Sequence, residues 1–86
     1  MIKRLDSLTK NFYKISMTQL KQFLLNGETY ATDQEISLRD LLMYFDYNDS
    51  LLVLEHNHLI CEKHKWKTTF IQHSDVIEVV TIVGGG

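Results

Sequence analysis

The run from Val76 to Val83 constrains the fold more than any other part of the chain. Seven of its eight residues are Val, Ile or Thr, and only Glu78 interrupts them. β-Branched side chains favour a strand. Apolar residues on both faces of this strand predict that it is central in a sheet and covered on one side by a helix.

Three glycines, Gly84, Gly85 and Gly86, follow this strand directly. Glycine loses more conformational entropy on ordering than any other residue, so a triglycine segment does not stabilise a domain. Without Cβ atoms it is thin enough to enter a narrow channel, and it leaves the α-carboxylate of Gly86 unhindered. An adenylating enzyme can convert such a carboxylate into an acyl-adenylate, which sulfur or an amine then attacks. The alternative, from the glycines alone, is a frayed or artificial terminus.

Size and composition predict one globular domain. The chain has 86 residues, of which 44% are hydrophobic and 23% charged, so there is no room for a second core. Its single cysteine, Cys61, excludes an internal disulfide and fits a reducing compartment. No apolar run approaches the length of a membrane span, and no secretory signal is visible.

The net charge of -2 is unevenly distributed. Residues 1–21 hold five basic residues against one acidic residue, whereas the remaining 65 hold four against ten. An acidic domain disfavours nucleic acid as a partner and suits docking on a basic protein surface.

Residues 1–17 are predicted to be an N-terminal extension. Their apolar positions are spaced three to four apart, which permits an amphipathic helical arm; these are Ile2, Leu5, Leu8, Phe12 and Ile15. The basic character of this segment is also found in transit peptides, but it lacks a convincing cleavage signal.

Two short β-prone runs, Leu20–Leu25 and Glu28–Thr32, flank Asn26-Gly27. Both positions of such a turn need positive φ, and Asn-Gly is the strongest short signal for a hairpin.

A helix is predicted to begin after Ser37 and to end near Asp46. Ser37 is a suitable N-cap, with Asp40 placed to complete a capping box. Ile36 and Leu41 have the spacing of a hydrophobic staple. The helix has one apolar stripe for a sheet to cover, formed by Leu38, Leu41, Leu42 and Phe45.

A second strand pair is predicted at Leu51–Glu55 and His58–Cys61, around a turn at His56-Asn57. Trp66 and Phe70 in the next connection are expected to pack in or around the core. The order is strand, strand, helix, strand, strand and a long central strand. This order predicts an α+β fold, a β-grasp (ubiquitin-like) roll with a mixed sheet and one main crossing helix, over residues 18–83 with a flexible tail at 84–86.

From about Leu20 to Gly86 the chain resembles the sulfur carriers of thiamine biosynthesis, the ThiS family. The resemblance is most specific where an Asp-x-x-Glu strand leads into terminal glycines, and Trp66 also agrees. The matching stretches are Leu25-Asn26-Gly27-Glu28, Ser37-Leu38-Arg39-Asp40-Leu41-Leu42, Val53-Leu54-Glu55-His56-Asn57 and Ser74 to Gly86.

This resemblance implies a defined chemistry. In that family an E1-like enzyme uses MgATP to adenylate the terminal glycine, which becomes a thiocarboxylate, and thiazole synthase takes the sulfur. Gly86 would be the reactive residue, and Gly84 and Gly85 would occupy the channel of the activating enzyme. The chain itself would be a cosubstrate with no catalytic residue, no bound cofactor and no metal.

The resemblance also implies partners and a location. We expect an E1-like adenylating enzyme, thiazole synthase and a sulfur-donor protein as partners, neither nucleic acid nor membrane, and a monomer when free. Thr81, Ile82 and Val83 are the candidate partner contacts. The expected compartment is bacterial cytoplasm or the stroma of a plastid (chloroplast). Two positions depart from the family pattern: Ser74, where the family usually has Gly, and His58, where a Gly often follows the turn Asn.

Other side chains give weaker signals. His56, His58 and His64 lie near Cys61 and Glu62, but their spacing matches no closed tetrahedral zinc set. We therefore expect exposed histidines and a small packed thiol. Lys63, Lys65 and Lys67 form a basic patch that is a further candidate for partner contact.

Three alternatives stay open. A molybdopterin-type sulfur carrier and a small ubiquitin-like modifier would share the fold and the reactive end. A β-grasp interaction module with no terminal chemistry belongs to a different class. An independent enzyme is least favoured, because no acid–base pair or activated nucleophile stands out.

Overall fold

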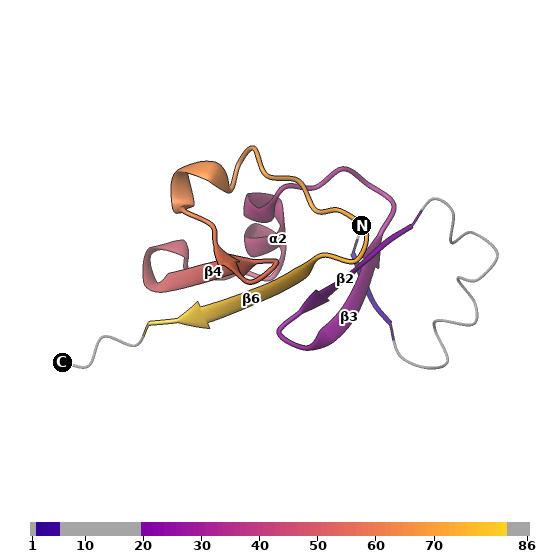
Figure 1. The fold of residues 1–86 in the computed structure, drawn as a ribbon, viewed down its shortest axis with the longest axis horizontal. Coiled ribbons are helices and arrows are strands. Elements are labelled where there is room, and N and C mark those ends of the chain that lie inside the picture. The colour runs from indigo at the N-terminus through magenta and orange to yellow at the C-terminus, as the bar shows by residue number, and fades with distance from the viewer. Residues whose placement is uncertain (1, 6–19, 83–86) are drawn as a thin grey trace.

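The computed structural model describes residues 2–5 and 20–82, which form one mixed sheet with a helix across one face (Figure 1). The strand order is β1-β3-β2-β6-β4-β5; β2 and β6 run parallel and all other neighbours antiparallel. The elements are β1 (Lys3–Arg4), β2 (Lys21–Leu25), β3 (Glu28–Thr32), α2 (Leu38–Tyr44), η2 (Asp49–Leu51), β4 (Leu52–His56), β5 (Leu59–Ile60), η3 (Lys63–Lys65) and β6 (Val76–Thr81). The predicted β-grasp class is confirmed.

Strand β6 is central, as predicted, and lies between β2 and β4 (Figure 1). Ile77 and Val79 are buried on the face that α2 covers, whereas Val80 and Ile82 are 57% and 52% exposed. One face of the strand therefore belongs to the core, and the other presents apolar side chains to the surroundings.

The β2–β3 hairpin turns at Asn26 and Gly27, with φ of 50° and 81°, which confirms the Asn-Gly prediction. Asn26 also attaches this turn to β6. Its N–H donates to the Ile77 carbonyl (2.9 Å), and its Oδ1 accepts the Val79 N–H (2.7 Å). The side chain thus continues the parallel ladder beyond the end of β2.

Helix α2 begins with the predicted capping box. Ser37 Oγ accepts the Asp40 N–H at 3.0 Å, and Asp40 Oδ2 accepts the Ser37 N–H at 2.9 Å. The helix ends at its C-cap Phe45, and Asp46 follows with a positive φ of 59°. Its buried stripe packs into a core that contains Phe23, Leu25, Ile36, Leu38, Leu41, Leu42, Leu52, Leu54, Trp66, Ile71, Ile77 and Val79.

The connection between β5 and β6 contributes to the same core. Trp66 is 2% exposed, and its Nε1–H donates to the Cys61 carbonyl at 2.8 Å. Phe70 lies at the rim, 43% exposed. Both roles agree with the sequence-based prediction.

The prediction of a helical arm is wrong for Lys3–Arg4, which form β1 against β3. The sheet therefore starts before residue 18. The edge of β3 offers backbone partners that outweigh a weak helical periodicity, and Ile2 and Leu5 are buried at 6% exposure each. Residues 6–17 of the predicted arm lie outside the described residues.

The second hairpin turns one residue later than predicted, at Asn57 and His58, with φ of 54° and 71°. His56 stays in β4 and pairs with Leu59, so β5 shortens to Leu59–Ile60 and Cys61 follows it.

The helices of residues 2–5 and 20–82 are too short, or too polar, to cross a membrane.

Candidate functional site

The predicted reactive segment follows β6. Val83, Gly84, Gly85 and Gly86 lie outside the described residues, so the structure defines the strand that leads to them. Thr81 and Ile82, the two predicted partner contacts that are described, are both exposed. The Ile82 N–H donates to the carbonyl of Leu51, the last residue of η2, at 2.6 Å. The backbone is therefore held by hydrogen bonds up to this residue.

The outer face of β6 alternates apolar and acidic side chains. Glu78 lies directly opposite Glu55 of β4, and Val80 lies opposite Val53. Like charges that face each other across strands destabilise a sheet. This surface therefore suits a partner that brings a cationic group surrounded by apolar area, in agreement with the predicted docking on a basic surface.

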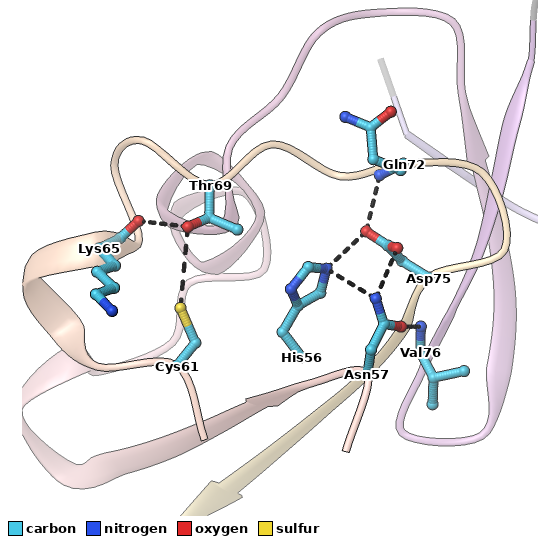
Figure 2. A network of polar contacts seen from close by, with 8 residues as sticks. All are labelled: His56, Asn57, Cys61, Lys65, Thr69, Gln72, Asp75 and Val76. Atoms are coloured by element: carbon cyan, nitrogen blue, oxygen red, sulfur yellow. Dashed lines mark hydrogen bonds and ion pairs between the residues drawn. The ribbon is translucent and has the colours of Figure 1, made fainter. Parts of the chain in front are cut away.

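The opposite end of β6 is fixed by contacts of the Asp75 carboxylate (Figure 2). This side chain is 7% exposed. His56 Nε2 lies 2.7 Å from Asp75 Oδ2, which also accepts the Gln72 N–H at 2.8 Å. Asn57 Nδ2 donates to Asp75 Oδ1 at 3.0 Å. One carboxylate thus joins the β4–β5 turn to the segment before β6.

Asn57 completes this anchor. Its N–H donates to the Val76 carbonyl at 2.7 Å. Its Oδ1 accepts the Val76 N–H at 2.8 Å (Figure 2). Burial raises the pKa of Asp75, but the hydrogen bonds from Gln72, His56 and Asn57 lower it further than burial raises it. The net pKa lies below the ordinary value of an aspartate, so the anchor is an ionised carboxylate at neutral pH.

The prediction of exposed histidines is wrong for His56, because its side chain is 21% exposed and engaged with Asp75. His73 also has a defined role, since its Nδ1 accepts the Gln22 N–H at 3.0 Å. His64 is exposed and lies 3.4 Å from Glu62. Within residues 2–5 and 20–82, His, Cys, Asp and Glu side chains form no group of three or more suited to a metal ion.

Cys61 is a half-buried thiol packed against the core, as predicted. Its Sγ lies 4.0 Å from Thr69 Oγ1, which donates to the Lys65 carbonyl at 2.8 Å (Figure 2).

The contacts of Asp75 with His56, Asn57 and Gln72 were not predicted from the sequence, although Asp75 belongs to the strand motif on which the resemblance rests.

The sheet order, the helix across one face of the sheet and the central strand β6 define a protein of the β-grasp class, with an exposed strand end as its candidate site. The chain belongs to the ThiS family, whose model matches residues 19–86. Proteins of this family are small sulfur carriers and not enzymes.

A solved structure agrees with this fold. The crystal structure of thiamine biosynthesis protein ThiS from Geobacter metallireducens superposes with a TM-score of 0.66 and 20% sequence identity. The match covers 76% of this chain and 99% of that one.

Curated relatives extend the comparison. The protein ycf40 of Trieres chinensis, described as uncharacterized, is 56% identical over 66 residues, which cover 77% of this chain and 90% of the relative. The ycf40 proteins of Porphyra purpurea and Pyropia yezoensis are 36% and 37% identical, each over 62 residues that cover 72% of this chain and 87% of theirs.

Proposed function

We propose that this chain is the sulfur carrier for the thiazole moiety of thiamine, with the carboxylate of Gly86 as its working group. One observation carries the proposal: the ThiS match extends through residue 86, and so includes both the anchored strand β6 and the glycines after it. The exposed Thr81 and Ile82 offer a partner a rigid place to hold beside that segment.

The chemistry belongs to the partners. A carboxylate oxygen of Gly86 attacks the α-phosphorus of MgATP in the E1-like enzyme, and pyrophosphate leaves. A sulfur nucleophile then attacks the carbonyl carbon and AMP leaves, so that hydrosulfide would yield a thiocarboxylate and one proton. Thiazole synthase takes up this sulfur. The carrier contributes an accessible carboxylate on an extended, narrow segment.

Mass spectrometry tests the proposal. The full chain, incubated with its activating enzyme, MgATP and sulfide, should gain the mass of one oxygen-to-sulfur exchange, located on the C-terminal peptide. An unchanged mass, with an activating enzyme that modifies its own known carrier in parallel, would overturn the proposal.

Variants locate the reaction. Deletion of Gly86 or the substitution Gly85→Trp should abolish the mass gain and leave the far-ultraviolet circular dichroism unchanged. Gly27→Ala is the matched control, because an added Cβ there meets no atom within 4 Å. It strains only the turn, where Gly27 has a φ of 81°, so the mass gain should persist.

The acceptor of the sulfur separates the pathways. Transfer to thiazole synthase supports the thiamine assignment, whereas transfer only to a molybdopterin synthase indicates the molybdopterin pathway. Amide bonds to other proteins indicate a modifier. Full partner binding by a C-terminally amidated chain, without any mass gain of the free acid, indicates an interaction module.

We also propose the plastid stroma as the compartment. The origin of the ycf40 relatives, in the algae Trieres chinensis, Porphyra purpurea and Pyropia yezoensis, favours a plastid over a bacterial cytoplasm. Fractionation of the source cells should recover the protein with stromal markers. Recovery in a bacterial or cytosolic fraction would contradict this location.

A further inference from the structure

Two hollows merge on the side of the molecule that carries α2 and η3. The first is lined by Arg39, Glu62, Lys63, His64 and Lys67. The second is lined by Ser37, Arg39, Asp40, Met43, Lys67 and Phe70. Arg39 and Lys67 belong to both, so the hollows form one surface, which we call the helix-side surface: Arg39, Met43, Lys63, Lys67 and Phe70.

The charge of this region differs from that of the rest of the domain. Four basic residues, Arg39, Lys63, Lys65 and Lys67, lie there against three acidic ones, Asp40, Asp49 and Glu62. The rest of residues 20–82 holds one basic residue, Lys21, against seven acidic ones. The helix-side surface is therefore where an acidic partner meets the least repulsion.

Two of the three acidic neighbours, Asp49 and Asp40, are already engaged. Asp49 is shared by Arg39 at 3.0 Å and Lys63 at 3.6 Å, and Asp40 accepts the N–H of the helix cap. Lys67 has no ion pair within residues 2–5 and 20–82. Its ammonium is available to a carboxylate from outside.

Apolar side chains lie in the same hollow as Lys67. Met43 is 67% exposed and Phe70 43% exposed. Met, aromatic residues and Arg are enriched at protein interfaces relative to the rest of the protein surface. A cluster of them on an exposed surface therefore indicates an interaction site. The surface suits a protein segment that carries carboxylates beside an apolar side chain.

The proposed chemistry requires a second surface of this kind. An acyl-adenylate has to stay in the activating enzyme until sulfur arrives, so that enzyme holds the end of β6. The sulfur donor must then approach a carrier whose strand end is occupied. The outer sheet face, with Glu55 opposite Glu78, would repel an acidic segment.

We propose that the helix-side surface docks an acidic, apolar-flanked segment of the sulfur-donor protein while the activating enzyme holds the C-terminal glycines. This inference rests on the proposed function. The donor would bind to α2 and residues 62–70, which lie on the side of the sheet that the helix covers (Figure 1).

A change of sulfur source tests this docking. The full chain, the activating enzyme, MgATP and a thiol reductant are supplied either with free sulfide or with the sulfur-loaded cognate donor protein. Lys67→Glu and Met43→Ser should slow the mass gain from the donor protein by about tenfold or more. With free sulfide, both variants should react at the wild-type rate, because no donor has to dock.

Arg4→Glu is the control for charge, because it makes the same type of reversal at an exposed residue of β1. Its donor-dependent rate should stay near that of wild type. Equal rates for wild type and both helix-side variants with the donor protein would overturn the docking proposal. Failure of wild type to gain mass even with free sulfide would instead overturn the proposed function.

Discussion

Ser74 and His58 adopt left-handed backbone conformations, with φ of 73° and 71°. The resemblance to ThiS predicted both positions as departures, because Gly is the expected residue there. A side chain in this region clashes with the backbone at a cost of about 1–2 kcal/mol per residue. The structure thus gives a physical reason for glycine at each turn and shows that this chain tolerates the strain.

Ser74→Gly should raise the free energy of unfolding by about 1 kcal/mol. Relief of strain exceeds the entropy that glycine adds to the unfolded chain. The hydrogen bond from the Ser74 N–H to the Gln22 carbonyl (2.6 Å) is unaffected, because it involves only backbone. Urea denaturation at neutral pH measures the difference.

The comparison variant is Thr68→Gly, since Thr68 is a turn residue without positive φ. This substitution should lower the free energy of unfolding. It adds flexibility to the unfolded chain, removes no strain and loses the hydrogen bond from Thr68 Oγ1 to the Lys65 carbonyl (3.4 Å). Stabilisation by both changes, or by neither, would contradict the strain explanation.

At the scale of elements, Asp75 attaches the β4–β5 turn to the beginning of β6. Asp75→Asn should lower the free energy of unfolding at pH 7 by about 2 kcal/mol, since hydrogen bonds to a charged group contribute about 1.5–3 kcal/mol. The carboxylate accepts contacts from His56, Asn57 and the Gln72 N–H, and the amide NH2 of the variant would be a further donor facing these groups. Chemical denaturation of both proteins measures this loss.

The same carboxylate sets a pH dependence. The folded pKa of Asp75 lies below the ordinary value of 3.8, so its stabilisation is complete above that value. It is lost as the pH falls through the lower, folded pKa. The stability difference between wild type and Asp75→Asn should shrink as the pH falls below 3.8. A difference that is constant from pH 7 into strong acid would exclude an ionic anchor.

Elements with local signals were predictable. The Asn26-Gly27 turn and the Ser37–Asp40 capping box depend on residues one to three positions apart, and the structure confirms both. Strand β1 was not predictable in this way, because its partner β3 lies more than twenty residues away. The shifted second turn has the same cause, since Asp75 engages His56 from 19 positions further along the chain.

At the scale of the whole molecule, the order of elements was sufficient for the β-grasp class, because a helix between two strand pairs leaves few topologies for a central last strand. The candidate site was only partly predictable. Thr81 and Ile82 are exposed as a contact surface requires, whereas the reactive glycines stay a prediction. The three lysines drew attention to one side, but Met43 and Phe70 joined that surface only through folding.

The central position of β6 also determines when this protein can fold. Strand β6 is the only element that pairs with both β2 and β4 among the described strands. Without it the described sheet falls into two separate pieces, β1-β3-β2 and β4-β5. The two-stranded piece β4-β5 would be marginally stable at best in water, and the three-stranded piece would leave the apolar face of α2 without β6 to cover it. During synthesis, the sheet can close only after β6 has left the ribosome. A chain that stops before β6 would therefore lack a closed sheet, and its unpaired strand edges would make it prone to aggregation.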